Sequence, residues 1–407
     1  MKTTAGHLTY CTNIHPGESW SDHFSALKQY IPKIKSKLVP HQKFGIGLRL
    51  SNLSSEQLQK PENLTEFKNW LSEENCYVFT MNGFPYGNFH RQRVKDQVHQ
   101  PDWTTRERVE YTKRLFLILS DLIPEGTDGG VSTSPLSYKP WFDEQQEREK
   151  ITKTATDNIL KILELLVHLR KTKKKVLHLD IEPEPDGLLE NSSEFVNWYK
   201  NDLIPAGIPF LQDKFGVPRK IALDLIRSHI CLCYDVCHFS IGYENAPDVL
   251  NKIAKEKIRI GKVQLSAAIK AYLNHDSKQR LSVADALRPF DEETYLHQVI
   301  AKRDDGSLYH YPDLPDALKH ITDNSVTEWR SHFHVPLFID HYGILESTKD
   351  AVMEIMNLQL SQPFTNHLEV ETYTWEVLPR DLQVDLEQSI IRELQWVTEL
   401  MPLSYPD

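Results

Sequence analysis

Acidic and histidine side chains stand at the ends of apolar, strand-like segments of this chain. The segment 231–235 is apolar and ends on Asp235, and His238 follows three residues later. An unpaired carboxylate in a buried strand is costly, so Asp235 needs a metal ion, another cation or a bound ligand as its partner. A structural alternative is that Asp235 caps the next helix or forms a salt bridge. This stretch alone is compatible with both interpretations.

Similar segments recur further along the chain. Apolar and polar residues alternate along segments 175–182, 261–266 and 367–373. Near the end of each segment, the polar residue that could point into a barrel is Glu182, Gln264 or Glu371, respectively. Successive side chains of a strand point to opposite faces. If the apolar sets face surrounding helices, the polar sets converge on the axis of a closed barrel. Their last members would then meet at the carboxyl rim, where the active sites of such barrels lie.

Clustered carboxylates at that rim predict a bound cation, because like charges around one point repel one another. Oxygen ligands suit Mg²⁺ or Mn²⁺, and an added histidine favours Mn²⁺ or Zn²⁺. We therefore expect a divalent metal (Mn, Mg or Zn) as cofactor. Its expected ligands are Glu182, Asp235, Gln264, His334 and Glu371. Structural alternatives exist for two of them. Glu182, which precedes a proline, could simply end a strand, and His334 could be a histidine packed in the core.

The same side chains could perform acid–base chemistry. Glu182 or Glu371 would remove the proton next to a substrate carbonyl and the other would return it, while His238 would orient a substrate oxygen. Further residues are expected to bind substrate. They are His7 in the first strand-like segment, Arg49 and Asn82 at the ends of segments 44–50 and 76–82, and Tyr86 in the stiff loop 83–87.

The elements that must position these residues alternate between strand and helix. Strands are expected at 7–13, 44–50, 76–82, 129–134, 175–182, 231–235, 261–266 and 367–373, with helices at 55–73, 104–122, 147–170, 193–203, 218–227, 245–257, 348–360 and 381–401. This rhythm predicts an α/β protein with a parallel sheet. The number of units favours a (β/α)8 TIM barrel. An open doubly wound sheet is less favoured, because no GxGxxG follows the first strand.

Region 267–328 breaks the rhythm. It is polar and carries the turn signal Arg303-Asp-Asp-Gly306, so we expect an insertion after the seventh strand within one domain spanning 1–407. The segment 332–338 is expected to be an extended loop or an extra strand outside the barrel.

Composition excludes several classes of function. The 407 residues carry a net charge of −10, which disfavours nonspecific nucleic-acid binding. No apolar run reaches the ~18 residues of a membrane span, and no signal core opens the chain, so we expect a cytoplasmic protein. The five cysteines are an odd number, and three share one segment, which predicts reduced core thiols rather than disulfides.

One motif resembles a known superfamily. Asp235-Val-Cys-His238 is similar to the Asp-x-x-His strand end of the xylose-isomerase-like barrels, which include sugar epimerases, hydroxypyruvate isomerase and endonuclease IV. The resemblance implies that Glu182 is the first metal-binding glutamate and Glu371 the last, which is also a base in the epimerases. Gln264 stands where those enzymes usually have a metal-binding histidine, and His334 is a candidate substitute.

Longer strings resemble the EboE family of metabolite traffic proteins. They are Gly6–Trp20, Asn82–Gly87, His332–Phe338 and His367–Trp375. This resemblance implies a bacterial gene-cluster protein that handles or exports a small metabolite or its prenyl-linked precursor. Other proteins of the cluster would be its partners, and no particular reaction is implied.

Three functions remain open at this point. A metal-dependent isomerase or epimerase of a sugar-like metabolite is the first. A binding or traffic protein without chemistry is the second, and it is motivated by Gln264. A phosphodiesterase resembling endonuclease IV is the least favoured, because Asn82 and Ser132 or Ser134 stand where that enzyme has additional histidines.

Overall fold

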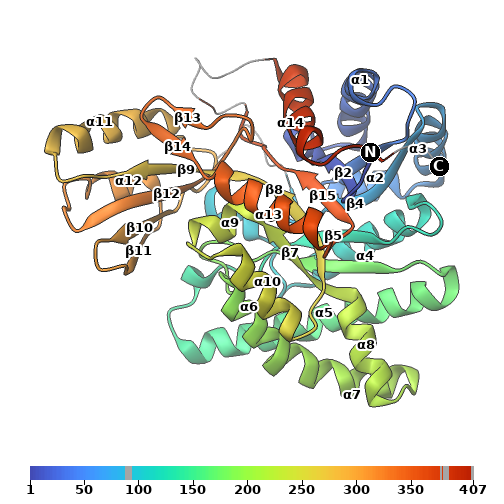
Figure 1. Cartoon of the computed structure of the whole chain (residues 1–407). Helices are drawn as coiled ribbons and strands as arrows, with labels where there is room; N and C mark the ends of the chain where they lie inside the picture. The colour runs from blue at the N-terminus through green and yellow to red at the C-terminus, as the bar shows by residue number, and fades with distance from the viewer. Residues whose placement is uncertain (88–93, 376–377, 379–384, 405–407) are drawn as a thin grey trace.

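Eight parallel strands form a nearly closed barrel in the computed structural model, which describes residues 1–87, 94–375, 378 and 385–404 (Figure 1). The strands are β2 (Gly6–Tyr10), β3 (Phe44–Arg49), β4 (Cys76–Asn82), β5 (Gly129–Thr133), β6 (Leu177–Ile181), β7 (Ile230–Asp235), β8 (Ile260–Leu265) and β15 (His367–Val370). Their order is β2-β15-β8-β7-β6-β5-β4-β3, with β1 (Lys2–Thr3) added beside β2. A single bridge between Cys11 and Gly47 joins β2 to β3. The predicted (β/α)8 barrel is confirmed.

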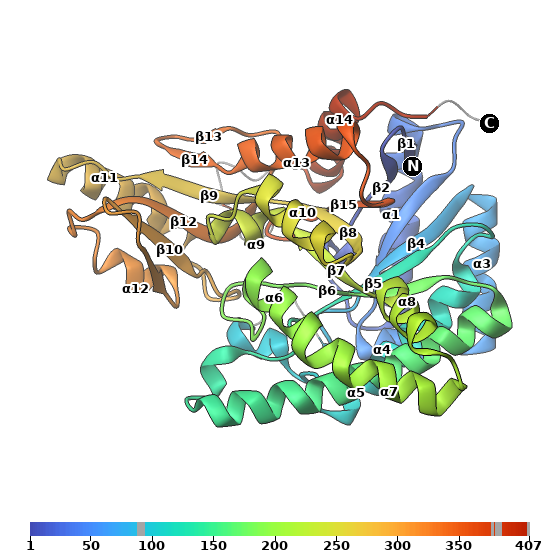
Figure 2. The same ribbon diagram turned by 60° about the horizontal axis from the view of Figure 1, so that its bottom comes forward.

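Helices surround the barrel (Figures 1 and 2). They are α1 (Trp20–Leu38), α2 (Asn52–Leu58), α3 (Pro61–Glu73), α4 (Arg106–Leu122), α5 (Gln145–Lys173), α6 (Ser192–Trp198), α7 (Ile204–Phe215), α8 (Arg219–His229), α9 (Val236–Ile241), α10 (Ala246–Lys255), α13 (Lys349–Ser361) and α14 (Leu386–Leu400). The expected helix 55–73 is two helices, because Pro61 starts a new one at its first turn. Helix α7 was not predicted, since Pro205 and Pro209 obscure its pattern. In the described part of the chain, no helix has the length and apolar character for crossing a membrane.

A second sheet extends to one side of the barrel (Figures 1 and 2). Its strands are β9 (Ala267–Tyr272), β10 (Val299–Arg303), β11 (Leu308–Tyr311), β12 (Val326–Val335), β13 (His341–Tyr342) and β14 (Leu345–Ser347), with helices α11 (Ser277–Leu287) and α12 (Leu314–Leu318). The sheet order is β11-β10-β12-β9-β14-β13. It begins at Ala267 and continues past residue 328 to Ser347. Residues 332–335 belong to β12, an extra strand outside the barrel.

The second sheet grows out of the barrel mouth. Only Ser266 separates β8 from β9, so the chain leaves the carboxyl end of a barrel strand and continues as a strand of the second sheet. Strand β12 returns antiparallel to β9, with Val335 opposite Ala267. The end of β12 is therefore placed at the mouth. The register of this pair shifts between Ser331 and Val335, and such bulges redirect side chains.

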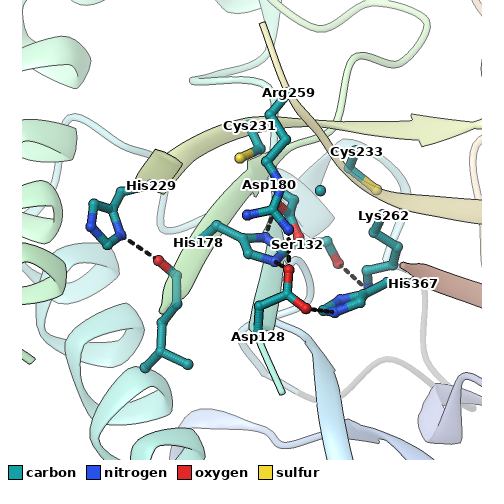
Figure 3. A network of polar contacts seen from close by, with 12 residues as sticks. Asp128, Ser132, His178, Asp180, His229, Cys231, Cys233, Arg259, Lys262 and His367 are labelled. Carbon is teal, nitrogen blue, oxygen red and sulfur yellow. Dashed lines mark hydrogen bonds and ion pairs between the residues drawn. The ribbon is translucent and has the colours of Figure 1, made fainter. Parts of the chain in front are cut away.

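The barrel interior is polar, as the alternation predicted. Lys262 Nζ lies 2.6 Å from Glu369 Oε2, and both charged side chains are fully buried. The same Nζ lies 3.1 Å from Ser132 Oγ (Figure 3). Glycine makes room for them: a Cβ atom added at Gly47 would lie 2.0 Å from Glu369 Oε1. Close approach to Glu369 therefore requires glycine at this position.

A second group of charges lies at the amino end of the strands. Asp128 contacts Arg259, His178 and His367, and His178 donates from Nδ1 to Asp180 at 2.6 Å (Figure 3). Burial raises the pKa of Asp128, but hydrogen bonds from the two histidines outweigh it and lower that pKa overall. These contacts neutralise the charges that the barrel encloses.

Lys262→Met is expected to destabilise the fold by about 3–5 kcal/mol, because it leaves the buried charge of Glu369 without its partner. The free energy of unfolding in urea measures this effect. Lys319→Met is the matched control, since Lys319 pairs with Asp316 at a similar 2.7 Å but is 69% exposed. The control should change stability by no more than about 1 kcal/mol. Equal effects of the two variants would contradict the expectation.

Candidate active site

A pocket opens at the carboxyl end of the barrel strands. The barrel contributes Asn13, Asn82, Glu182, Glu184, His238, Glu371 and Tyr373, and the insertion contributes Tyr295, Leu296, Gln298, His332 and His334. Phe84, Pro85, Val94, Lys95, Val98 and His99 complete the lining. The pocket therefore lies between the barrel mouth and the second sheet.

Asp235 caps a helix and keeps one oxygen free of hydrogen bonds. Its Oδ1 accepts hydrogen bonds from the backbone N–H of His238 (3.1 Å) and from Ser266 Oγ (2.7 Å), so it caps α9. Its Oδ2 is buried without a hydrogen-bond partner. A capping carboxylate with one bare oxygen can still bind a cation.

Glu371 is held by amide groups. Its Oε1 accepts from Asn13 Nδ2 and Asn82 Nδ2, each at 2.8 Å, and its Oε2 accepts from Gln264 Nε2. Gln264 Oε1 in turn accepts from Cys233 Sγ. Both ends of the Gln264 amide are therefore occupied, and its contact with the site passes through Glu371.

Glu182 lacks such support. Its Oε2 is buried and has no hydrogen-bond partner, and its Oε1 lies 3.8 Å from His238 Nδ1. Burial, followed by the charges of Glu371 and Asp235, raises the pKa of Glu182 well above its usual value. Burial and the charge of Asp235 raise the pKa of Glu371 in the same way. Without a cation, these carboxyl groups favour the protonated state.

His334 is brought to the mouth by the end of β12. Its Nδ1 donates to the backbone oxygen of Glu371 at 2.9 Å, and its Nε2 is buried without a partner. Ligand atoms of Asp235, His238 and His334 all lie within 4.8 Å of one another. This places His334 next to the carboxylates, although it comes from the insertion.

The donor set fits a divalent cation. Glu182 Oε2, Asp235 Oδ2 and His334 Nε2 are all buried atoms without hydrogen bonds, and buried polar atoms in that state call for a specific partner. Two carboxylate oxygens and one imidazole nitrogen are ligands that Mn²⁺ and Zn²⁺ accept. Glu371 lies beside them with both oxygens already hydrogen-bonded.

Three of the expected substrate-binding residues lie elsewhere. His7 is at the amino end of β2, where its Nδ1 lies 2.7 Å from Tyr77 Oη. The Arg49 guanidinium donates to the backbone oxygens of Gly87 and Gly17. Tyr86 packs against Tyr111, with ring centroids 5.1 Å apart. Among the described lining residues, only Asn82 of the four expected substrate contacts is present.

Sequence reasoning missed several residues of the pocket. Glu184 is separated from Glu182 by one proline. The only sequence feature that pointed to Glu184 was a second acidic residue just beyond the end of the strand. Asn13 ends the first strand-like segment, which is the position that a rim residue should have. His332 stands two residues before His334, a spacing that puts both side chains on the same face of a strand. Both side chains are buried.

The fold and the site define a TIM-barrel protein with a histidine- and carboxylate-lined mouth. No protein-family model and no curated protein matches the chain. Among solved structures, the IolI protein with a bound zinc atom is 13% identical, with 98% of both chains covered and a TM-score of 0.46. The probable 3-DHS dehydratase AsbF from Bacillus anthracis is 12% identical, covering 97% of this chain and 98% of that chain, with a TM-score of 0.45.

A xylose isomerase-like TIM barrel protein from Mycobacterium smegmatis in complex with magnesium is also similar. It is 11% identical, with 97% of this chain and 96% of that chain covered and a TM-score of 0.45.

Proposed function

We propose that this protein is a metal-dependent isomerase or epimerase of a small, sugar-like metabolite, with a divalent cation held by Glu182, Asp235 and His334 beside Glu371. The observation that carries the proposal is that Glu182, Asp235 and His334 each have a buried ligand atom without a hydrogen bond. All three residues lie close to His238 at the barrel mouth. When bound, such a cation supplies Lewis-acid polarisation of a carbonyl–hydroxyl pair.

The side chains of this chain supply the proton transfer. Glu182 is the proposed base: its Oε2 would hold the cation, whose charge would keep the carboxylate ionised and able to accept a proton from carbon. Glu371 is oriented by the three amides around it and would return the proton to the substrate. Asn82 and Asn13 fix Glu371, so they act as positioning residues. His238 borders the same space.

Asp235→Asn tests the cation site directly. The variant retains an oxygen that can cap α9 but loses the carboxylate charge, so we expect it to lose the bound metal of the carboxylate site. Elemental analysis of the chain after loading with Mn²⁺ or Zn²⁺ measures this. Asp102→Asn is a control, since Asp102 is a buried carboxylate whose two oxygens are both hydrogen-bonded, to the backbone N–H of Thr104 and to Ser137 Oγ. Unchanged metal content in Asp235→Asn would contradict the proposal.

A second candidate function is a binding or traffic protein that keeps the pocket without the chemistry. Gln264 favours it, because both ends of its amide are occupied within the protein and it adds no ligand to the cation. The EboE resemblance supports the same direction, with a small or prenyl-linked metabolite as cargo. Retained affinity for a ligand after chelation, with no turnover on a broad panel of sugars, would favour this function over the first.

A further inference from the structure

Two buried histidines of the pocket face each other through their Nε2 atoms. His238, at the start of α9, and His332, on β12, have these nitrogens 3.1 Å apart. Their rings are nearly perpendicular, with an interplanar angle of 84°. What lies between the two nitrogens depends on which atoms of each ring carry hydrogen.

The opposite nitrogens fix the tautomer of both rings. His238 Nδ1 lies 3.2 Å from the backbone oxygen of Pro183, which can only accept. His332 Nδ1 lies 2.8 Å from Gln298 Oε1. The Gln298 amide is itself oriented, because its Nε2 donates to the backbone oxygen of Pro185 at 3.2 Å. Both Nδ1 atoms therefore carry the hydrogen, and in the neutral rings both Nε2 atoms are bare.

Two bare nitrogens at this distance repel each other unless a positive centre lies near both. Both residues are buried, with exposed fractions of 5% and 7%, so bulk water has little access to the two nitrogens. Two nitrogen ligands of a tetrahedral zinc ion, each about 2.0–2.1 Å from it, lie roughly 3.3 Å apart. The observed separation is close to that value. Histidines that donate from Nδ1 to a carbonyl are also the usual arrangement in metal sites.

A third donor lies within reach of both rings. Ligand atoms of Glu184, His238 and His332 are within 4.8 Å of one another. Glu184 Oε1 is buried and makes no hydrogen bond. His99 Nε2 lies 3.1 Å from this oxygen, at the distance of an ion pair. We propose that His238, His332 and Glu184 bind a second transition-metal ion of the zinc class, separate from the cation of the carboxylate site. Because two of three donors are imidazoles, Zn²⁺ is favoured over Mg²⁺.

The insertion makes this second site possible. The bulge near the end of β12 places His332 against α9 while His334, two residues on, reaches the carboxylates. One strand thus supplies a histidine to each ion. The second site needs no carbonyl chemistry, so it is independent of the proposed isomerase function.

Zinc stoichiometry of the full chain tests the inference. The wild-type protein, stripped with EDTA and titrated with zinc chloride, should bind two ions per chain in elemental analysis and calorimetry. His332→Gln should bind one zinc ion. Its zinc affinity at the second site should fall more than ~100-fold, which exceeds the effect of mutating a residue that only hydrogen-bonds to a metal ligand. Glu184→Gln should weaken zinc binding at the same site. It provides an independent test if His332→Gln does not fold. Circular dichroism checks the fold of both.

His297→Gln is the matched control. His297 is a buried histidine next to His332, but both of its ring nitrogens are already hydrogen-bonded, to the backbone oxygen of His332 and to Glu292. It should keep two zinc ions. Unchanged zinc stoichiometry and affinity in both His332→Gln and Glu184→Gln would overturn the inference. Loss of zinc in these variants but not in Asp235→Asn would support it and contradict the carboxylate site instead.

Discussion

Glu182→Gln should lower the rate of hydrogen exchange next to a substrate carbonyl by about 10²–10⁴-fold, the usual contribution of a general base. The amide has nearly the same shape as the carboxylate but cannot accept the proton. Mass spectrometry of aldoses and ketoses incubated in D₂O with the Mn²⁺- or Zn²⁺-loaded protein measures the exchange. Metal content is measured in parallel, because Glu182 is also a proposed ligand.

The comparison needs a glutamate outside the pocket. Glu244 is half-buried and accepts from the backbone N–H of Ser192 at 2.8 Å, so Glu244→Gln should retain the wild-type rate. If Glu182→Gln exchanged as fast as the wild type, proton abstraction by Glu182 would be refuted. If the wild type bound sugars but exchanged none of them, the binding function would be favoured.

The same replacement should stabilise the metal-free protein at alkaline pH. The pKa of Glu182 is raised above its ordinary value of 4.5, first by burial and then by the charge of Glu371. The folded state therefore binds more protons than the unfolded state, and stability falls as the pH rises from about 4.5 towards the folded pKa. Glu182→Gln lacks this loss, so its free energy of unfolding should exceed that of the wild type at pH 8.

Urea unfolding of the EDTA-treated proteins at several pH values measures this difference, which should shrink towards pH 5. The buried histidines act in the opposite direction. Burial lowers the pKa of His238 from 6.5 to about 4, so stability is lost as the pH falls through this interval. That contribution is present in both proteins and largely cancels in the comparison. A difference that grew towards acidic pH would contradict the expectation.

Added Zn²⁺ should stabilise the wild type more than the variant, since a ligand of the native state shifts unfolding by mass action.

Much of the barrel could be predicted because its signals are local. Alternation along 175–182 and 367–373 assigns Asp180 and Glu369 to the interior, and both are buried there. The positions of Glu182, Asp235 and Glu371 at one rim follow from the same alternation, once eight strand–helix units close into a ring. All five cysteines are buried and free, as their spacing predicted.

The sequence by itself determined which face of each barrel strand is polar, because side-chain direction depends only on a residue's place in its own strand. Only the tertiary structure decided which histidines reach the mouth. His332 and His334 arrive there because β12 pairs with β9, more than fifty residues earlier in the chain. The register of that pairing is set by long-range hydrogen bonds and packing, and no local pattern in the sequence specifies it. For His7 the sequence was sufficient, because it opens the expected strand 7–13 and the start of a strand lies at the amino end of the barrel.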